Sequence, residues 1–160
     1  MLNQQKYLMK NKFQAIWLTG QPGSGKTTLA NLLINHLNSQ NTNDRFYNID
    51  GDDLRDLFQN KDYSKKGRLA NIRLGMSIAA YLINKNQFPV ISLVSPYRDL
   101  REEFKAKFAV LEVYLQTTEL RGRENYFVSE YEKPLNNFIE IDTTHQSEKE
   151  SLNEILNVYR

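Results

Sequence analysis

The chain of 160 residues has no cysteine, a single tryptophan, two histidines and no long apolar run. The absence of cysteine excludes disulfides, thiolate catalysis and cysteine-ligated zinc. The histidines, His36 and His145, lie far apart in the sequence, which argues against a histidine-based metal site. Because residues 1–12 are polar, they fit neither a signal peptide nor a membrane span. We expect them to form a loose N-terminal arm of a cytoplasmic protein.

An excess of charge of one sign is also missing. Lysine and arginine number 21, aspartate and glutamate number 19, and the net charge is +2. Proteins that bind nucleic acid or a membrane surface usually concentrate basic charge, so we expect neither partner. A length of 160 residues fits one domain spanning residues 1–160.

Five short apolar runs predict buried strands at residues 13–19, 45–50, 88–94, 109–115 and 138–142. Their nearly continuous apolar character is typical of parallel strands that are covered on both faces. Helical periodicity lies between the runs, and Ser147 with Glu150 forms a capping box before a last amphipathic helix. Alternating strands and helices predict a doubly wound α/β fold with helices on both faces of the sheet.

Three polar motifs follow the first three of these runs. GQPGSGKT (20–27) comes after the first, DGDDLR (50–55) overlaps the end of the second, and SPYR (95–98) comes after the third. Ligands in open α/β sheets bind beyond the carboxyl ends of the strands. The sequence therefore predicts that the three motifs converge on one site.

GQPGSGKT has the spacing of a P-loop, and a predicted strand and helix flank it, which disfavours the alternative of a glycine-rich turn without function. Its backbone N–H groups and the following helix N-terminus suit phosphate. Lys26 is expected to bridge the β- and γ-phosphates of ATP and to act in catalysis, and the Thr27 hydroxyl to bind Mg²⁺. The predicted ATP-binding residues of this motif are Gly20, Gly23, Ser24, Gly25, Lys26, Thr27 and Thr28.

The acidic turn DGDDLR predicts a catalytic carboxylate. Asp52 is expected to bind the Mg²⁺ or to accept the proton of an attacking hydroxyl, with Asp50 as second choice. The alternative is a helix N-cap, for which Asp53 is better placed, and this leaves Asp52 free.

A second set of residues suits an anionic acceptor. Arg68, Asn71 and Gly75 have the spacing of one helix face, and guanidinium groups such as those of Arg55 and Arg68 bind anions bidentately. The alternative for such arginines, Arg73 included, is a solvated helix face.

The loop SPYR and two aromatic residues allow the same two interpretations. Ser95 either lines an acceptor pocket or caps a helix that has Pro96 in its first turn. Tyr63 and Phe58 either stack on a nucleobase or belong to the core.

In this order and at this spacing, the motifs resemble the adenylylsulfate kinase family. The segments that carry the resemblance, over about residues 13–144, are GQPGSGKT, DGDDLR, Tyr63, RLANIR (68–73), SPYR, YEKP (131–134) and IDTT (141–144). The resemblance implies a P-loop NTPase three-layer sandwich with a five-stranded parallel sheet of order 2-3-1-4-5, and usually a homodimer. It implies transfer of the γ-phosphate of ATP to the 3′-hydroxyl of a nucleotide. The acceptor-binding residues would be Asp50, Arg55, Tyr63, Arg68, Asn71, Ser95 and Pro96.

The segment 117–134 departs from the family, whose basic lid is longer and ends in Phe-Thr-Gly-Ile, an aromatic clamp for the acceptor base. Arg121 and Arg123 are expected to reach the ATP phosphates as lid cations, unless RGR is a solvated loop. Tyr126 or Phe127 is the candidate replacement for the clamp.

This short-lid variant is similar to cytidine diphosphoramidate kinase, a relative associated with capsule phosphoramidate biosynthesis. We expect that acceptor, with adenylylsulfate as the alternative. A P-loop kinase of a non-nucleotide metabolite and a non-catalytic nucleotide-binding module are further alternatives.

Overall fold

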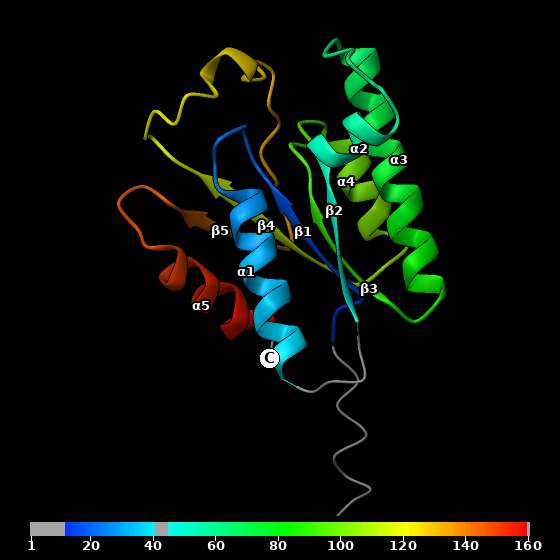
Figure 1. Cartoon of the computed structure of the whole chain (residues 1–160), viewed down its shortest axis with the longest axis vertical. Coiled ribbons are helices and arrows are strands. Elements are labelled where there is room, and N and C mark those ends of the chain that lie inside the picture. Colours follow the sequence, from blue (N-terminus) through cyan, green and yellow to red (C-terminus); the bar gives the residue numbers. More distant parts are fainter. Residues whose placement is uncertain (1–11, 41–44, 160) are drawn as a thin grey trace, which may run out of the picture.

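The computed structural model describes residues 12–40 and 45–159, so the predicted N-terminal arm, apart from Lys12, lies outside the described residues (Figure 1). All five predicted strands form, in one parallel sheet of order β2-β3-β1-β4-β5, as the resemblance implied. The strands are β1 (Ala15–Thr19), β2 (Phe46–Asp50), β3 (Phe88–Ser92), β4 (Val110–Gln116) and β5 (Phe138–Asp142).

Helices connect the strands. They are α1 (Lys26–Ser39), α2 (Gly51–Leu57), α3 (Lys65–Asn84), α4 (Arg98–Lys105), the short 3₁₀ helix η2 (Glu124–Tyr126) and α5 (Glu148–Tyr159). The predicted capping box precedes α5: the Glu150 N–H donates to Ser147 Oγ at 3.2 Å, and the Ser147 N–H donates to Glu150 Oε2 at 2.9 Å. No helix of the described residues is long and apolar enough to cross a membrane.

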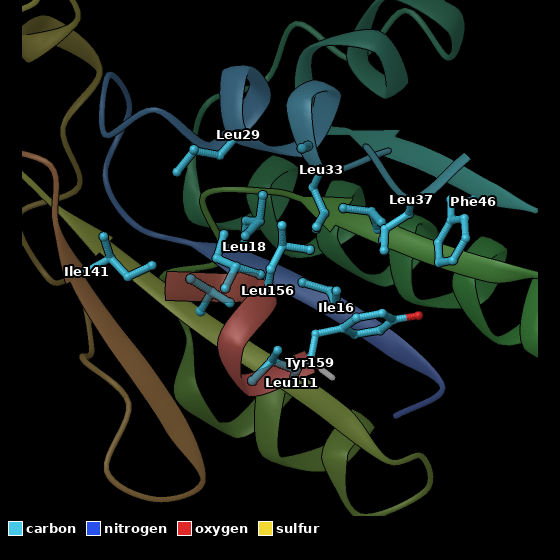
Figure 2. Packing of buried hydrophobic residues seen from close by; sticks show 14 of the residues in the cluster. Ile16, Leu18, Leu29, Leu33, Leu37, Phe46, Leu111, Ile141, Leu156 and Tyr159 are labelled. Atoms are coloured by element: carbon cyan, nitrogen blue, oxygen red, sulfur yellow. The ribbon is translucent and has the colours of Figure 1, made fainter. Parts of the chain in front are cut away.

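The central strand β1 shows why both faces of the sheet are covered. Its side chains alternate: Ile16 and Leu18 belong to one apolar cluster, Ala15 and Trp17 to the other. Helices α1 and α5 cover the first face, and α2, α3 and α4 cover the second (Figure 1). Figure 2 shows Leu29, Leu33 and Leu37 of α1 projecting onto the first face. Full burial of such a leucine side chain contributes about 1.5–3 kcal/mol.

The strand order decides which loops meet. Strand β1 lies between β3 and β4: the connection from β1 leads to β2 on one side, and the connection from β3 crosses to β4 on the other. The loops after β1, β2, β3 and β4 therefore gather at one carboxyl edge, where ligands bind in folds of this class.

Candidate active site

A cavity of about 550 Å³ lies at this carboxyl edge, within the size range of small-molecule sites. Its walls come from the P-loop, the acidic turn, α3, the loop after β3 and the segment 117–134, which we call the lid segment. Every predicted site residue lines the cavity except Gly20 and Ser24. Phe58, Arg73 and Phe127 are not among the lining residues, whereas Tyr126 is.

Gly20 and Ser24 support the P-loop from behind. Gly20 has φ of 139°, and a Cβ there would lie 2.2 Å from the backbone carbonyl oxygen of Leu115, so only glycine fits. Ser24 is buried, and its Oγ accepts a hydrogen bond from Lys26 Nζ at 3.4 Å. Gly25, with φ of 99°, is the N-cap of α1 and turns the loop into the helix.

Lys26 is buried, and its side chain is hydrogen-bonded to the backbone of the P-loop. Its Nζ donates to the carbonyl oxygens of Gly20 at 3.0 Å and Gln21 at 2.8 Å. Burial lowers the pKa of Lys26 to about 7, although the negative charges of Asp50 and Asp52 raise it. A phosphate beside Nζ would favour the charged form, which suits this lysine to binding an anion.

Asp50, rather than Asp52, contacts Thr27. The Thr27 hydroxyl donates to Asp50 Oδ2 at 2.7 Å, and the Ser92 hydroxyl donates to the same oxygen at 2.9 Å. The other oxygen, Oδ1, accepts from the backbone N–H groups of Asp52 at 2.9 Å and Asp53 at 3.4 Å. Asp50 is therefore the N-cap of α2, and the expectation that Asp53 caps this helix is wrong, because Asp50 is the residue with extended backbone directly before the first turn.

The oxygens of Thr27 and Asp50 form a donor set that suits Mg²⁺, a hard cation that prefers hydroxyl, carboxylate and phosphate oxygens. The two side chains already converge, so they fit the metal without histidine or a dedicated cluster. Within the described residues there is no group of three or more histidine, cysteine, aspartate or glutamate side chains that would hold a metal alone. A metal here would be shared with the phosphates of ATP.

Asp52 lies at the rim of the cavity and faces the lid segment. Arg123 Nη2 donates to Asp52 Oδ2 at 3.2 Å, and the two side chains are 49% and 63% exposed. A pair this exposed contributes at most about 1 kcal/mol, so ligands can separate it easily. The Asp52 carboxylate is therefore accessible from the cavity.

Arg121 is fixed to the P-loop side of the cavity. Its Nη1 donates to the Gly23 carbonyl oxygen and to Thr143 Oγ1, both at 3.2 Å, and its Nη2 donates to the Thr143 carbonyl oxygen at 2.9 Å. The segment RGR is exposed, as a solvated loop would be, but it is in contact with the P-loop and the acidic turn.

The predicted acceptor residues line the opposite wall. Arg55 is buried, donates to the carbonyl oxygens of Asn60 at 3.1 Å and Asp62 at 2.9 Å, and lies 4.2 Å from the Tyr63 ring centroid. Asn71 donates through Nδ2 to the Gly51 carbonyl oxygen at 3.2 Å. Its Oδ1 is buried and accepts no hydrogen bond within residues 12–40 and 45–159. A hydroxyl or amino group of a ligand would satisfy this oxygen.

Two tyrosines face each other at the mouth of the cavity. The ring centroids of Tyr63, from the segment before α3, and Tyr126, from η2, lie 5.6 Å apart at an interplanar angle of 51°. Of the two candidates for the missing clamp, Tyr126 is therefore the one beside Tyr63. A flat base can stack on either ring once the rings separate.

Ser95 lines the cavity, but it does not cap a helix. It has φ of 47°, α4 begins only at Arg98, and Tyr97 is the N-cap residue, so the interpretation of Pro96 as a first-turn proline is wrong. The Ser95 hydroxyl instead accepts a hydrogen bond from Trp17 Nε1 at 3.1 Å. The buried Arg101 guanidinium donates to the Ser95 carbonyl oxygen and so fixes the loop from the core side.

Sequence reasoning missed the buried support of this loop. Arg101 Nε lies 2.7 Å from Glu112 Oε1, and both side chains are fully buried. Glu112 is the one acidic residue in the otherwise apolar run 109–115, and this signal was available in the sequence. An acid in a buried strand requires a basic partner.

The fold and the glycine-lined loop between β1 and α1 define a P-loop kinase. A model of the adenylylsulphate kinase family matches residues 12–145. The adenylyl-sulfate kinase of Burkholderia ambifaria is 31% identical over 171 aligned positions, covering 93% of this chain and 93% of its own. The chain belongs to the adenylylsulphate kinase family. It is an ATP- and Mg²⁺-dependent phosphotransferase with an alcohol group as acceptor.

Solved structures agree on the fold. The APS kinase CysC of Mycobacterium tuberculosis, in complex with AMPPNP and APS, has a TM-score of 0.76 and 22% identity, over 91% of this chain and 96% of its own. A gluconokinase from Sinorhizobium meliloti has a TM-score of 0.65 at 16% identity, over 92% of each chain. Because kinases with such different names share the fold, the fold alone does not identify the acceptor.

Proposed function

We propose that this protein transfers the γ-phosphate of ATP to the 3′-hydroxyl of a nucleotide, and that adenylylsulfate is the acceptor. The observation that carries the proposal is the one cavity shared by the P-loop, Asp52 and the set Arg55, Tyr63, Arg68 and Asn71. The relatives described above are named for adenylyl-sulfate, and they support this acceptor better than cytidine diphosphoramidate. The expectation of a capsule-related substrate finds no support among them.

In the proposed mechanism the side chains and backbone of the protein orient the two substrates and neutralise the charge of the ATP phosphates. The P-loop N–H groups and Lys26 bind the phosphates, and Arg121 and Arg123 approach them from the lid segment. Arg55, Arg68 and Asn71 hold the acceptor so that its 3′-hydroxyl faces the γ-phosphate. Asp52 accepts the hydroxyl proton. Thr27 and Asp50, together with the phosphates, would hold Mg²⁺, which would neutralise phosphate charge.

Cytidine diphosphoramidate remains a second candidate because of the lid segment. The ring beside Tyr63 is Tyr126, in a lid that lacks the Phe-Thr-Gly-Ile sequence of the family. A different aromatic wall favours a different base. The phosphoramidate group of cytidine diphosphoramidate also carries an N–H donor, which a sulfate lacks. The buried oxygen Asn71 Oδ1 could accept a hydrogen bond from this N–H.

ADP release with Mg-ATP and each of the two acceptors tests the proposal. We expect turnover with adenylylsulfate. Turnover with cytidine diphosphoramidate alone would instead assign the second candidate. No turnover with either nucleotide, together with turnover of a sugar acid, would indicate the non-nucleotide kinase.

Replacing Tyr63 with alanine tests whether the acceptor is a nucleotide at all. We expect KM for the acceptor to rise about tenfold with little change in KM for ATP, since base–aromatic stacking contributes about 1–3 kcal/mol. Tyr81→Ala is the matched control, because Tyr81 is an exposed tyrosine of α3 that does not line the cavity. A silent Tyr63→Ala would favour the non-nucleotide kinase.

The homodimer implied by the family resemblance is also a proposal. Light scattering of the purified protein at micromolar concentration measures it. A mass of about 37.6 kDa, twice the chain mass of 18.8 kDa, supports the dimer, and a mass of 18.8 kDa contradicts it.

A further inference from the structure

Gln21, in the P-loop, and Val128, in the lid segment, are joined by two hydrogen bonds across 107 positions of sequence. The Val128 N–H donates to Gln21 Oε1 at 2.9 Å, and Gln21 Nε2 donates to the Val128 carbonyl oxygen at 2.8 Å. Val128 is buried and lines the cavity. The Gln21 side chain thus pairs with the lid backbone as a neighbouring strand would.

Only an amide side chain satisfies both bonds at once. It carries an acceptor and a donor on one planar group, and the backbone of Val128 offers the complementary donor and acceptor. Glutamate would place a second acceptor against the Val128 carbonyl oxygen, and leucine would offer neither bond. The two bonds also fix which end of the amide faces which atom.

The same residue touches the phosphate-binding lysine. Lys26 Nζ donates to the backbone carbonyl oxygen of Gln21 at 2.8 Å. Phosphates of ATP that bind Lys26 Nζ would therefore act on a group that contacts the Gln21 backbone. On the other side of Gln21, Val128 lies two positions after Tyr126, whose ring faces Tyr63 at the acceptor end of the cavity.

Gln21 itself is not among the residues that line the cavity, so it acts through its neighbours. Among residues 12–40 and 45–159, the other hydrogen bond from the lid segment to the P-loop, from Arg121 Nη1 to the Gly23 carbonyl oxygen, lies on the ATP side. The pair of Arg123 and Asp52 is exposed and easily separated. The Gln21–Val128 pair is therefore the half-buried connection from the P-loop to the acceptor side of the lid segment.

We propose that Gln21 is a positioning residue that couples ATP binding to the acceptor wall of the lid segment. An ATP-ordered P-loop holds the Gln21 amide, the amide holds Val128, and Val128 sets the position of Tyr126 beside Tyr63. The acceptor part of this proposal rests on the proposed nucleotide kinase function. Because coupling between two sites is reciprocal, bound acceptor should tighten ATP to the same degree.

The first test needs no acceptor. Hydrogen exchange of the Val128 amide is measured with and without AMPPNP in the wild type, Gln21→Leu and Gln21→Glu. We expect AMPPNP to slow exchange in the wild type, and Gln21→Leu to exchange about tenfold faster and to lose the AMPPNP effect. Gln21→Glu keeps an acceptor for the Val128 N–H, so its exchange rate should lie between those of the wild type and Gln21→Leu. Wild-type protection in Gln21→Leu would overturn the proposal.

The second test separates positioning from a general weakening of the P-loop. We expect Gln21→Leu to raise KM for the acceptor about tenfold and to change the Kd of AMPPNP by less than about twofold. Gln14→Leu is the matched control: Gln14 Oε1 also accepts a backbone N–H, from Ala109 at 3.0 Å, but at the far end of β1. Equal loss of affinity for both ligands in Gln21→Leu would overturn the proposal.

The two tests also distinguish a failure of the proposed function from a failure of the proposed coupling through Gln21. If the wild type turned over neither nucleotide, the proposed function would fail, and the exchange measurement would still decide whether Gln21 couples AMPPNP to Val128. If turnover were normal and Val128 exchange did not depend on Gln21, the coupling would fail and the proposed function would stand.

Discussion

Replacing Asp52 with asparagine is expected to lower kcat by about 10²- to 10⁴-fold, the usual contribution of a positioned general base. Asparagine has nearly the same shape, but it cannot accept the proton of the attacking hydroxyl at neutral pH. The Kd of AMPPNP should change little, because the P-loop groups that bind phosphate remain in place. Steady-state turnover and calorimetric titration with AMPPNP measure the two quantities.

Asp53→Asn is the matched control for this variant. Asp53 occupies the next position of the same helical turn, is exposed and does not line the cavity, so its replacement should leave kcat within about twofold of the wild type. If Asp52→Asn kept wild-type kcat, Asp52 would not be the general base, and another group would have to accept the proton of the attacking hydroxyl. Asp50 is a poor substitute, because its oxygens accept hydrogen bonds from Ser92 and two backbone N–H groups and, with Thr27, face the proposed Mg²⁺ site.

The parts of the fold that sequence could predict are those that short-range patterns determine. The central strands β1, β3 and β4 are runs of buried residues as expected, whereas the edge strands β2 and β5 are only partly buried. Each polar motif follows a strand, so the convergence of the motifs on one edge was predictable. The strand order was not contained in those patterns. It came from the family resemblance, because periodicity does not say which strands are neighbours.

It was harder to predict which of several chemically similar residues caps a helix or accepts a given hydrogen bond. Asp50, Asp52 and Asp53 are all acceptable caps in sequence, and only the backbone conformation decides that Asp50 accepts the N–H bonds. Ser95 before proline is typical of a helix start, but the hydrogen bond from Trp17 and the positive φ place it in an irregular loop before α4. Both decisions depend on residues that lie outside the motif.

Long-range pairs were hardest to predict, for a physical reason. A glutamine in a P-loop is compatible with solvent exposure, and nothing near Gln21 in sequence indicates that its amide will meet a backbone 107 positions later. Glu112 carried a partial signal, since a buried acid requires a partner, but the sequence offered many basic residues. Only the fold selects Arg101 among them.

Replacing Arg101 with methionine is therefore expected to lower the free energy of unfolding by about 3–5 kcal/mol, the usual cost of removing one partner of a buried ion pair. Methionine fills part of the volume but offers no donor. Among the described residues, Glu112 would keep Lys105 as its one charged partner, and the carbonyl oxygens of Ser95 and Glu132 would each lose a guanidinium hydrogen bond. Urea unfolding followed by circular dichroism measures the change.

Arg73→Met is the control, because Arg73 also pairs with a glutamate, Glu103, at 3.5 Å, but with side chains 59% and 39% exposed. Solvent screens that pair, so its loss should cost less than about 1 kcal/mol. Equal costs for the two variants would show that burial does not strengthen the Arg101 contact. With the expected difference, Arg101 also explains how the loop after β3 keeps the buried Ser95 in a conformation with positive φ. The guanidinium that holds the Ser95 carbonyl is itself held by a buried carboxylate, so the acceptor side of the cavity derives its rigidity from the core.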